Sequence, residues 1–248
     1  KSFFYGEVSL DGTLRPTRGI LLLGLFAKQL GPNTTIYVPE QSAPEAGVIS
    51  GTKVIPVKNL SQLVEHLSGK EKIAPLKSRV FPEPEDYTPV EFDLAEIAGQ
   101  EQAKRALIIA ASGGHNLLMW GPPGTGKTML SRALPGILPP LTTSEALEVT
   151  RIYSVSGLLN PGQALLSRRP FRSPHHGISG AGMIGGGSNP LPGEVSLAHL
   201  GVLFLDEMAE FPRSVLESLR QPMEDGVVSI VRVGAYVSYP ASFTLLAA

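Results

Sequence analysis

Hydrophobic residues along the chain gather in short runs separated by turn-forming residues, a pattern typical of alternating strands and helices. Over residues 1–70, runs rich in β-branched side chains predict strands, and runs with helical spacing predict helices. Asp11-Gly12 predicts a hairpin turn, and Gly31 predicts the end of the first helix. The predicted strands lie at 34–38 and 53–57, and the predicted helices at 18–30 and 61–67. This part of the chain is therefore predicted to form an α/β domain.

Residues 71–92 interrupt the pattern, because four prolines stand among charged residues there. Such a composition predicts an extended linker. A second α/β domain is expected at 93–248, where Thr142 and Glu145 fit a capping box. Its predicted elements are helices at 100–112, 129–134, 144–150 and 212–221, buried strands at 116–120 and 202–205, an irregular stretch at 160–193, and a hairpin at 227–237 that turns near Gly234.

The composition limits what such a fold can do. Of 248 residues, 42% are hydrophobic and 17% are charged, which indicates a globular chain rather than a disordered one. The net charge of −1 gives no overall attraction to nucleic acid, so any basic surface has to be local. The absence of cysteine excludes disulfides and thiolate metal sites, and it favours a reducing compartment such as the cytoplasm. The apolar run at 20–27 is too short to span a bilayer, so no membrane partner is expected.

One motif carries most of the candidate chemistry, because residues 121–128 fit the phosphate-loop pattern G-x-x-x-x-G-K-[ST]. Glycines let backbone N–H groups curl around a phosphate, and the following helix adds its positive N-terminal end. We expect Lys127 to reach the β- and γ-phosphates and to assist catalysis, and Thr128 to ligate Mg²⁺. The nucleotide-binding residues are therefore predicted to be Gly121, Pro122, Pro123, Gly124, Thr125, Gly126, Lys127 and Thr128.

A second motif supplies two carboxylates, since the apolar run 202–205 leads directly into Asp206-Glu207. We expect Asp206 to hold Mg²⁺ through its water ligands, and Glu207 to act as the catalytic carboxylate that polarises the attacking water. Either motif alone is ambiguous, because the first can be a plain glycine-rich turn and the second a strand that leaves the core. Together they predict a Mg²⁺-dependent ATPase that binds ATP or ADP.

Several further strings resemble one branch of the AAA+ ATPases. The string at 93–101 resembles the segment that lines the adenine pocket of these proteins, so Ile97 and Ala98 are expected to bind the nucleotide. The strings at 169–176, 185–190 and 193–199 resemble the Mg-chelatase-like branch. This resemblance covers 93–248 almost throughout, and it implies an AAA+ core in which helices flank a parallel sheet.

Residues 1–70 resemble the C-terminal part of the Lon-like α/β domain that precedes the ATPase in the YifB/ComM family. That resemblance implies a homo-hexameric, ATP-driven DNA helicase that migrates DNA branches in natural transformation. Two alternatives remain open: a chelatase-type ATPase that remodels a protein partner for metal insertion, and a nucleotide-binding module alone. Leu21 follows Gly19-Ile20 where proteolytic Lon domains place a lysine, so peptidase activity is not expected. The sensor 1 residue, arginine finger and helical lid of the family are expected beyond Ala248, so the chain is expected to be part of a longer protein.

Some residues leave two interpretations open. His175-His176 suggests a metal site, but neighbouring side chains in an extended loop diverge, which favours an ordered or surface loop. Three arginines stand just before this pair: Arg168, Arg169 and Arg172. They either contact phosphate or a neighbouring subunit, or are simply solvated. The glycine-rich stretch 177–187 is either a mobile pore loop or a connector. The hairpin at 227–237, with Arg232, is either a DNA contact or an ordinary edge hairpin.

Overall fold

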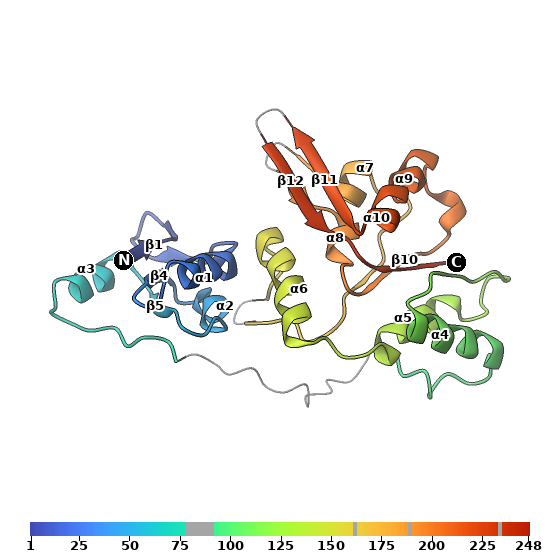
Figure 1. The fold of residues 1–248 in the computed structure, drawn as a ribbon, viewed down its shortest axis with the longest axis horizontal. Helices are drawn as coiled ribbons and strands as arrows, with labels where there is room; N and C mark the ends of the chain where they lie inside the picture. Colours follow the sequence, from blue (N-terminus) through green and yellow to red (C-terminus); the bar gives the residue numbers. More distant parts are fainter. Residues whose placement is uncertain (78–91, 161–162, 188–189, 233–234) are drawn as a thin grey trace. The chain divides into compact units, whose positions relative to one another are not determined.

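The computed structural model describes the whole chain except residues 78–91, 161–162, 188–189 and 233–234 (Figure 1). The chain divides into two compact units. The first unit comprises Lys1–Glu83 and Ala146–Leu166, and the second comprises Pro84–Glu145 and Ser167–Ala248. Most of the expected linker at 71–92, and the expected hairpin turn at Gly234, lie outside the described residues.

The first unit is built around a three-stranded parallel sheet in the order β1-β4-β5. Its core forms where Ile36, Val38 and Val54 of the sheet pack against Ile20 of helix α1. The predicted helices and strands are confirmed, with β4 running one residue further than predicted, through Pro39. The elements are β1 (Ser2–Phe4), β4 (Thr35–Pro39), β5 (Lys53–Val57), α1 (Ile20–Gln29), α2 (Ala43–Gly47) and α3 (Leu60–Leu67).

A hairpin stands beside this sheet, as the Asp11-Gly12 turn signal predicted. Its strands β2 (Glu7–Val8) and β3 (Leu14–Arg15) pair antiparallel. Gly12 has a φ of 82°, in the left-handed region that favours glycine. The Asp11 carboxylate accepts hydrogen bonds from the Thr13 hydroxyl at 2.7 Å and the Thr13 backbone N–H at 3.0 Å. These two bonds, the hydroxyl first, lower the pKa of Asp11.

Helix α6 (Thr143–Ser156) is longer than the predicted 144–150 segment. The predicted capping box at its start is confirmed. The Thr142 N–H donates to the Glu145 carboxylate at 2.8 Å, and the Glu145 N–H donates back to the Thr142 hydroxyl at 3.3 Å. The backbone N–H of Thr142 is the main cause that lowers the pKa of Glu145.

From Ala146 onward this helix belongs to the first unit. The chain before it, Pro84–Glu145, and the chain from Ser167 onward both belong to the second unit. Ser154 of the helix makes two contacts within the first unit. The Ser154 carbonyl accepts from the Gly19 N–H at 3.2 Å, and its hydroxyl donates to the Glu45 carboxylate at 2.7 Å. Burial raises the pKa of Glu45, and the Ser154 hydrogen bond offsets only part of that effect.

The second unit holds a four-stranded parallel sheet in the order β6-β13-β10-β7. All four side chains of β10 are fully buried, as expected for a parallel strand covered on both faces. Leu203 and Leu205 pack into a core with Val215, whereas Val202 and Phe204 pack on the other face. The strands are β6 (Leu117–Leu118), β13 (Thr244–Ala247), β10 (Val202–Leu205) and β7 (Phe171–Arg172).

Helices cover both faces of this sheet. The predicted helices at 100–112 and 129–134 are confirmed as α4 (Glu101–Gly113) and α5 (Lys127–Ile137), which contact each other (Figure 1). Their side chains form one core cluster with β10, and the other cluster includes residues of α7 (Gly180–Ile184), α8 (Glu194–Leu197) and α9 (Arg213–Ser218). Within the described part of the chain, no helix has both the length and the apolar character needed to cross a bilayer.

Three predictions for the second unit need correction. The buried strand predicted at 116–120 is short and lies at an edge among the described strands, with Trp120 98% exposed, because β6 pairs with β13 alone. The stretch at 160–193 is not wholly irregular, since it holds β7, α7, β8 (Gly185–Gly186) and β9 (Leu191–Pro192). The helix predicted at 212–221 is two consecutive helices, α9 and α10 (Arg220–Asp225).

The predicted hairpin is confirmed and extends further than expected. Strand β11 (Val227–Arg232) pairs antiparallel with β12 (Ala235–Pro240), from Val227 opposite Pro240 onward. Figure 1 shows the two strands as long paired arrows next to α7 and α10. Val228 and Ile230 turn into the core, whereas Val231 and Tyr236 are 70% and 71% exposed. One face of the hairpin therefore anchors it, and the other is open to solvent.

Candidate functional site

The phosphate-loop motif lies between β6 and α5, as its pattern requires. Gly124 and Gly126 have φ angles of 80° and 83°, and a Cβ at either position would meet nothing within 4 Å. The backbone conformation, not a lack of space, is therefore what calls for glycine here. The Thr125 hydroxyl closes the loop by donating to the Pro122 carbonyl at 2.9 Å. Helix α5 then begins at Lys127, with its first N–H groups facing the loop end.

Lys127 is held inside its own loop. Its ammonium group donates to the carbonyls of Gly121 at 2.9 Å and Pro122 at 3.0 Å. The charge is therefore kept beside the backbone that is expected to surround the phosphates. A positive side chain, the backbone N–H groups of the loop and a helix N-terminus converge on one small volume, which is the chemistry of a polyphosphate site.

The two sequence motifs meet in space. The Thr128 hydroxyl donates to Oδ2 of Asp206 at 2.9 Å, across 78 residues of sequence. Asp206 reaches this position because it comes directly after the buried strand β10, at the carboxyl edge of the sheet. Strand β13 lies between β6 and β10, the strands that precede the two motifs. Hydrogen bonds from the segments after β6 and β10 join both of them to the end of β13. Its end accepts the Met119 N–H and the Met208 N–H, at Ala247 and Ala248 respectively, each at 2.9 Å.

The donor set around Thr128 fits magnesium. A hydroxyl and a carboxylate are hard oxygen ligands, which Mg²⁺ prefers, and this ion usually keeps several waters and shares its coordination with substrate phosphates. The described residues contain no group of three or more His, Cys, Asp or Glu side chains placed to hold a metal without such help. The protein side of the site is thus suited to an ion that arrives with a nucleotide.

Glu207 has an unusual backbone. Its φ of 53° and ψ of 50° put it in the left-handed region, which non-glycine residues rarely adopt. Its carbonyl accepts the Glu210 N–H at 2.8 Å and so starts the short 3-10 helix Met208–Glu210. The side chain, next to Asp206 in the sequence, is 70% exposed. Backbone strain of this kind is concentrated at functional sites.

The adenine-pocket string lies next to the phosphate loop. Ile97 is buried against Leu130 and Leu134 of α5, whereas Ala98 is exposed. Sequence reasoning missed Gln100, which also has a left-handed backbone, with a φ of 58°. Its side-chain amide donates to the Thr125 carbonyl at 3.2 Å, so it joins this string to the phosphate loop. The one sequence feature that could have indicated Gln100 is its position within the same string, 93–101.

Two of the three arginines at 168–172, Arg169 and Arg172, make contacts within the second unit. Arg169 is only 14% exposed and donates to Glu145 at 3.4 Å and to the Leu200 carbonyl at 2.8 Å. Arg172 forms a two-pronged ion pair with Glu194, at 2.6 and 2.7 Å. Both guanidinium groups are therefore engaged in contacts within the second unit.

The histidine pair lies in a loop, as the favoured interpretation predicted, but one premise of that interpretation is wrong. The two rings do not diverge, because their centroids are 4.0 Å apart. His176 then points at the candidate catalytic carboxylate, with Nδ1 3.6 Å from Oε2 of Glu207. Nothing in the sequence pattern indicated this contact, since it joins a loop after β7 to a residue after β10. The metal interpretation of the pair finds no support among the described residues.

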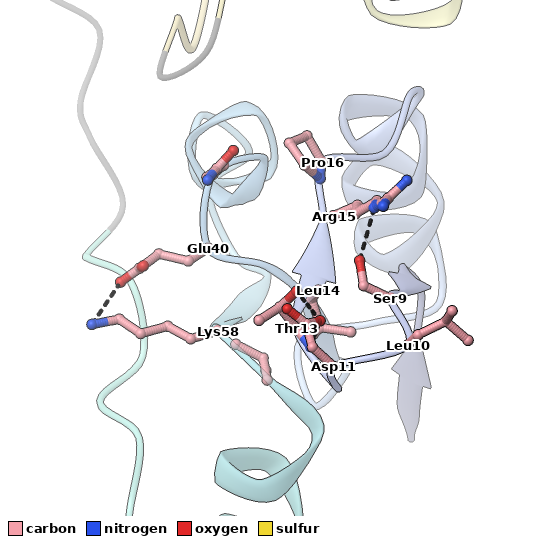
Figure 2. A pocket seen from close by; sticks show the side chains of 11 residues that line it. Ser9, Leu10, Asp11, Thr13, Leu14, Arg15, Pro16, Glu40 and Lys58 are labelled. Carbon is pink, nitrogen blue, oxygen red and sulfur yellow. Dashed lines mark hydrogen bonds and ion pairs between the residues drawn. The ribbon is translucent and has the colours of Figure 1, made fainter.

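A separate pocket lies on the first unit, beside its hairpin (Figure 2). Figure 2 shows Lys58 paired with Glu40, at 3.7 Å, and Arg15 donating to the Ser9 hydroxyl, at 2.7 Å. Leu10, at the hairpin tip, is fully exposed at its rim. The charges of Lys58 and Glu40 neutralise each other. Leu21, the residue at the Lon lysine position, is buried in α1.

Comparison with known proteins agrees with the geometry of the second unit. The family described as "Magnesium chelatase, subunit ChlI" matches residues 93–248. A complex of the magnesium chelatase subunits BchI and BchD, based on single-particle cryo-EM, contains a chain with a TM-score of 0.51 and 23% identity. The match covers 64% of this chain and 55% of that one, and it shows a shared fold. The predicted AAA+ fold, with helices flanking a parallel sheet, is confirmed.

Relatives that match both units are more similar in sequence. Competence protein ComM of Haemophilus influenzae is 44% identical over 252 residues, covering 99% of this chain and 48% of that protein. An uncharacterised protein of Escherichia coli, YifB, is 43% identical over 245 residues, covering 98% and 47%. The chain thus spans about half the length of these relatives. By sequence and by fold, it belongs to the magnesium chelatase ChlI family of AAA+ ATPases, in the group that contains YifB and ComM.

Proposed function

We propose that this chain binds ATP with Mg²⁺ and hydrolyses it, as the ATPase part of a longer motor protein. The observation that carries the proposal is the 2.9 Å hydrogen bond between Thr128 and Asp206. It joins the residue that follows the phosphate loop to the first carboxylate after the buried strand. Two motifs that are each ambiguous alone form one site, with oxygen ligands suited to Mg²⁺ on one side and the Lys127 cation on the other.

Each residue has a distinct task in this mechanism. The loop at 121–126 and the start of α5 bind the β-phosphate through backbone N–H groups, and Lys127 neutralises charge on the β- and γ-phosphates. Thr128 and Asp206 hold Mg²⁺, which when bound neutralises charge that develops on the phosphate oxygens. Glu207 accepts a hydrogen bond from the attacking water and orients it in line with the leaving group. Ile97 and Ala98 are proposed to contact the adenine.

A phosphate-release assay on the full-length protein tests this proposal. ATP turnover is expected to need Mg²⁺, to stop when EDTA removes the ion, and to return when Mg²⁺ is added in excess. Thr128→Ala is expected to raise the Mg²⁺ concentration needed for half-maximal turnover, because it removes one ligand. Turnover that continues in EDTA would contradict the assignment of Thr128 and Asp206.

The work done by hydrolysis is proposed to be movement on DNA, by a homo-hexamer, with branch migration as the reaction. Two observations support this. The relatives with 43–44% identity match both units, and one of them is named a competence protein. The β11–β12 hairpin also exposes one face near its turn, where Val231 and Tyr236 are 70% and 71% exposed. The side chain of Arg232 lies outside the described part of the chain, and it remains the proposed phosphate contact.

Branch migration on a synthetic four-way junction tests the DNA proposal. Arg232→Ala is expected to slow migration while basal ATP turnover stays near the wild-type rate. Binding is expected to weaken steeply with added salt and to be insensitive to sequence, because the contacts are to phosphates. A hexamer that binds no DNA at low salt with ATP present would overturn this part of the proposal.

A chelatase-type motor that remodels a protein partner is the second candidate function. It is favoured by the family match of residues 93–248, whose description names magnesium chelatase. That match leaves out most of the first unit, whereas the ComM and YifB matches include it. This function is therefore the second candidate. We propose that residues 1–70 are the C-terminal part of a Lon-like domain and that the protein is cytoplasmic. Stimulation of ATP turnover by DNA, but not by chelatase partner subunits, is the expected result.

A further inference from the structure

The histidine pair after β7 lies against the candidate catalytic carboxylate, a contact that the nucleotide motifs do not explain. His176 Nδ1 is 3.6 Å from Oε2 of Glu207. The two residues follow neighbouring strands of the same sheet, since β7 and β10 are hydrogen-bonded to each other. The contact therefore rests on the strand order of the second unit and not on local sequence.

The imidazole of His176 is held in place from two sides. On one side it meets the His175 ring, with centroids 4.0 Å apart and planes at 47°. His175 is itself fixed, because its Nδ1 accepts the Gly177 N–H at 3.0 Å. On the other side His176 stands edge-on to Phe211, at 6.4 Å and 85°, and Phe211 is buried in the core. A ring anchored in this way can restrain a carboxylate that is otherwise largely exposed.

Glu207 has its main chain restrained as well. Its left-handed backbone, with a φ of 53°, is kept by the hydrogen bond from Glu210 and by the bond between Met208 and the Ala248 carbonyl. The backbone sets the direction in which the Glu207 side chain leaves the main chain, and His176 lies beside the carboxylate at its other end. The strain at Glu207 and the anchored imidazole thus point to one task, which is to set the direction of a carboxylate.

We infer that His176 is a positioning residue that orients the Glu207 carboxylate for water activation. This role requires a proton on Nδ1, so that the imidazole faces Oε2 as a donor. Oε1 is then left to accept the hydrogen bond from the attacking water. The inference rests on the proposed ATP hydrolysis and adds a residue to it. A packing role alone would require only the ring against Phe211, whereas a positioning role requires the N–H.

Two substitutions separate these roles in the full-length protein. His176→Phe keeps a ring against Phe211 but removes the donor, and His176→Gln keeps an N–H donor but removes the ring. Since a small misplacement of a reacting group can cost about 10²-fold in rate, His176→Phe is expected to lower kcat roughly 10- to 100-fold with little change in KM. His176→Gln is expected to retain most of the turnover. His115→Phe, at an exposed histidine of the same unit, is the matched control and is expected to match the wild type.

A double substitution tests whether His176 acts through Glu207. In a Glu207→Gln background, His176→Phe is expected to cause no further loss in single-turnover hydrolysis, because the group that it orients is already missing. Nucleotide affinity is expected to be the same in all these variants. The inference is overturned if His176→Phe turns over at the wild-type rate, if His176→Gln is as slow as His176→Phe, or if the loss persists in the Glu207→Gln background.

Failure of the proposed function gives a different result. If the wild-type protein shows no turnover that depends on Lys127 and Mg²⁺, the ATPase proposal fails and the positioning role fails with it. If that turnover is present and His176→Phe leaves it unchanged, only the positioning role fails.

Discussion

Two helices, one in each unit, begin with nearly the same backbone. Helix α1 follows Gly19, with φ 77° and ψ 18°, and α5 follows Gly126, with φ 83° and ψ 15°. Neither glycine has a side chain that could cap its helix, and each helix belongs to an α/β unit with a parallel sheet. Both have a positive helix end, yet only α5 is a candidate phosphate site. At the start of α1 the Leu21 N–H is already hydrogen-bonded to the Glu45 carboxylate.

The side chains that follow the glycine account for the difference. Ile20 and Leu21 at the start of α1 are fully buried, so this helix end is used for packing. At the start of α5, Lys127 lies in the phosphate loop and Thr128 reaches Asp206. A helix N-terminus is thus a common feature, and it becomes a nucleotide site only where a cation, a metal ligand and open space are added to it. Four substitutions test this comparison.

The largest expected effect is that of Glu207→Gln. The amide keeps the shape of the side chain but cannot polarise water, and loss of a general base typically costs about 10²- to 10⁴-fold in rate. Turnover by the full-length protein is expected to fall by that factor, while ATP remains bound and can be measured by filter binding. A variant with turnover within a factor of a few of the wild type would show that Glu207 is not the catalytic carboxylate.

Lys127→Ala is expected to remove nucleotide binding without unfolding the unit. Loss of one member of a hydrogen-bonded charge pair costs about 2–5 kcal/mol, which is roughly a 30-fold or greater loss of affinity. Calorimetry measures this directly, and Trp120, which is exposed and precedes the loop, offers a fluorescence signal. Lys28→Ala, at an exposed lysine in the last turn of α1, is the control and is expected to leave affinity unchanged. Equal affinity in the two variants would contradict the site.

Ile20→Ala is the counterpart in the first unit. It removes a fully buried side chain from the start of α1, so the free energy of unfolding of that unit is expected to fall by about 2–5 kcal/mol. Nucleotide affinity is expected to remain unchanged, the reverse of Lys127→Ala. Urea denaturation followed by circular dichroism measures the first effect, and calorimetry measures the second. A loss of affinity in folded Ile20→Ala would mean that the two helix starts do not have separate roles.

Glu45→Gln is expected to have the smallest effect, and one that depends on pH. Because the pKa of Glu45 is raised in the folded unit, the folded state holds the proton more tightly than the unfolded chain. The stabilisation is complete below the unfolded pKa, and it is lost as the pH rises from about 4 through the folded pKa. Glutamine stays neutral and can still accept the Ser154 hydrogen bond.

The measurement compares the two proteins in urea at acidic and neutral pH. The stability of Glu45→Gln relative to the wild type is expected to increase as the pH rises. A difference that is constant with pH, or one that changes in the opposite direction, would show that burial of this carboxylate does not oppose its charge.

Much of the local structure could be predicted because short-range rules govern it. The Asp11-Gly12 turn, the capping box of Thr142 and Glu145, and the helix that follows Gly126 each depend on a few adjacent residues. Burial was harder to predict. The run at 117–120 is wholly apolar, like 202–205, yet Trp120 is exposed and β10 is buried. The two runs differ in burial because β6 lies at an edge among the described strands and β10 lies between two others. A short segment of sequence does not specify this position.

The sequence by itself determined the family, the α/β class and the residues of both nucleotide motifs, because these are set by spacing and side-chain chemistry within short segments. Only the tertiary structure decided which distant residues meet. It placed β13 between the motif strands, joined Thr128 to Asp206, paired Arg172 with Glu194, set His176 against Glu207, and packed the helix from Ala146 into the first unit. Such contacts depend on strand order and on loops that close across many residues. Their energy comes from the assembled sheet, so no local pattern specifies them.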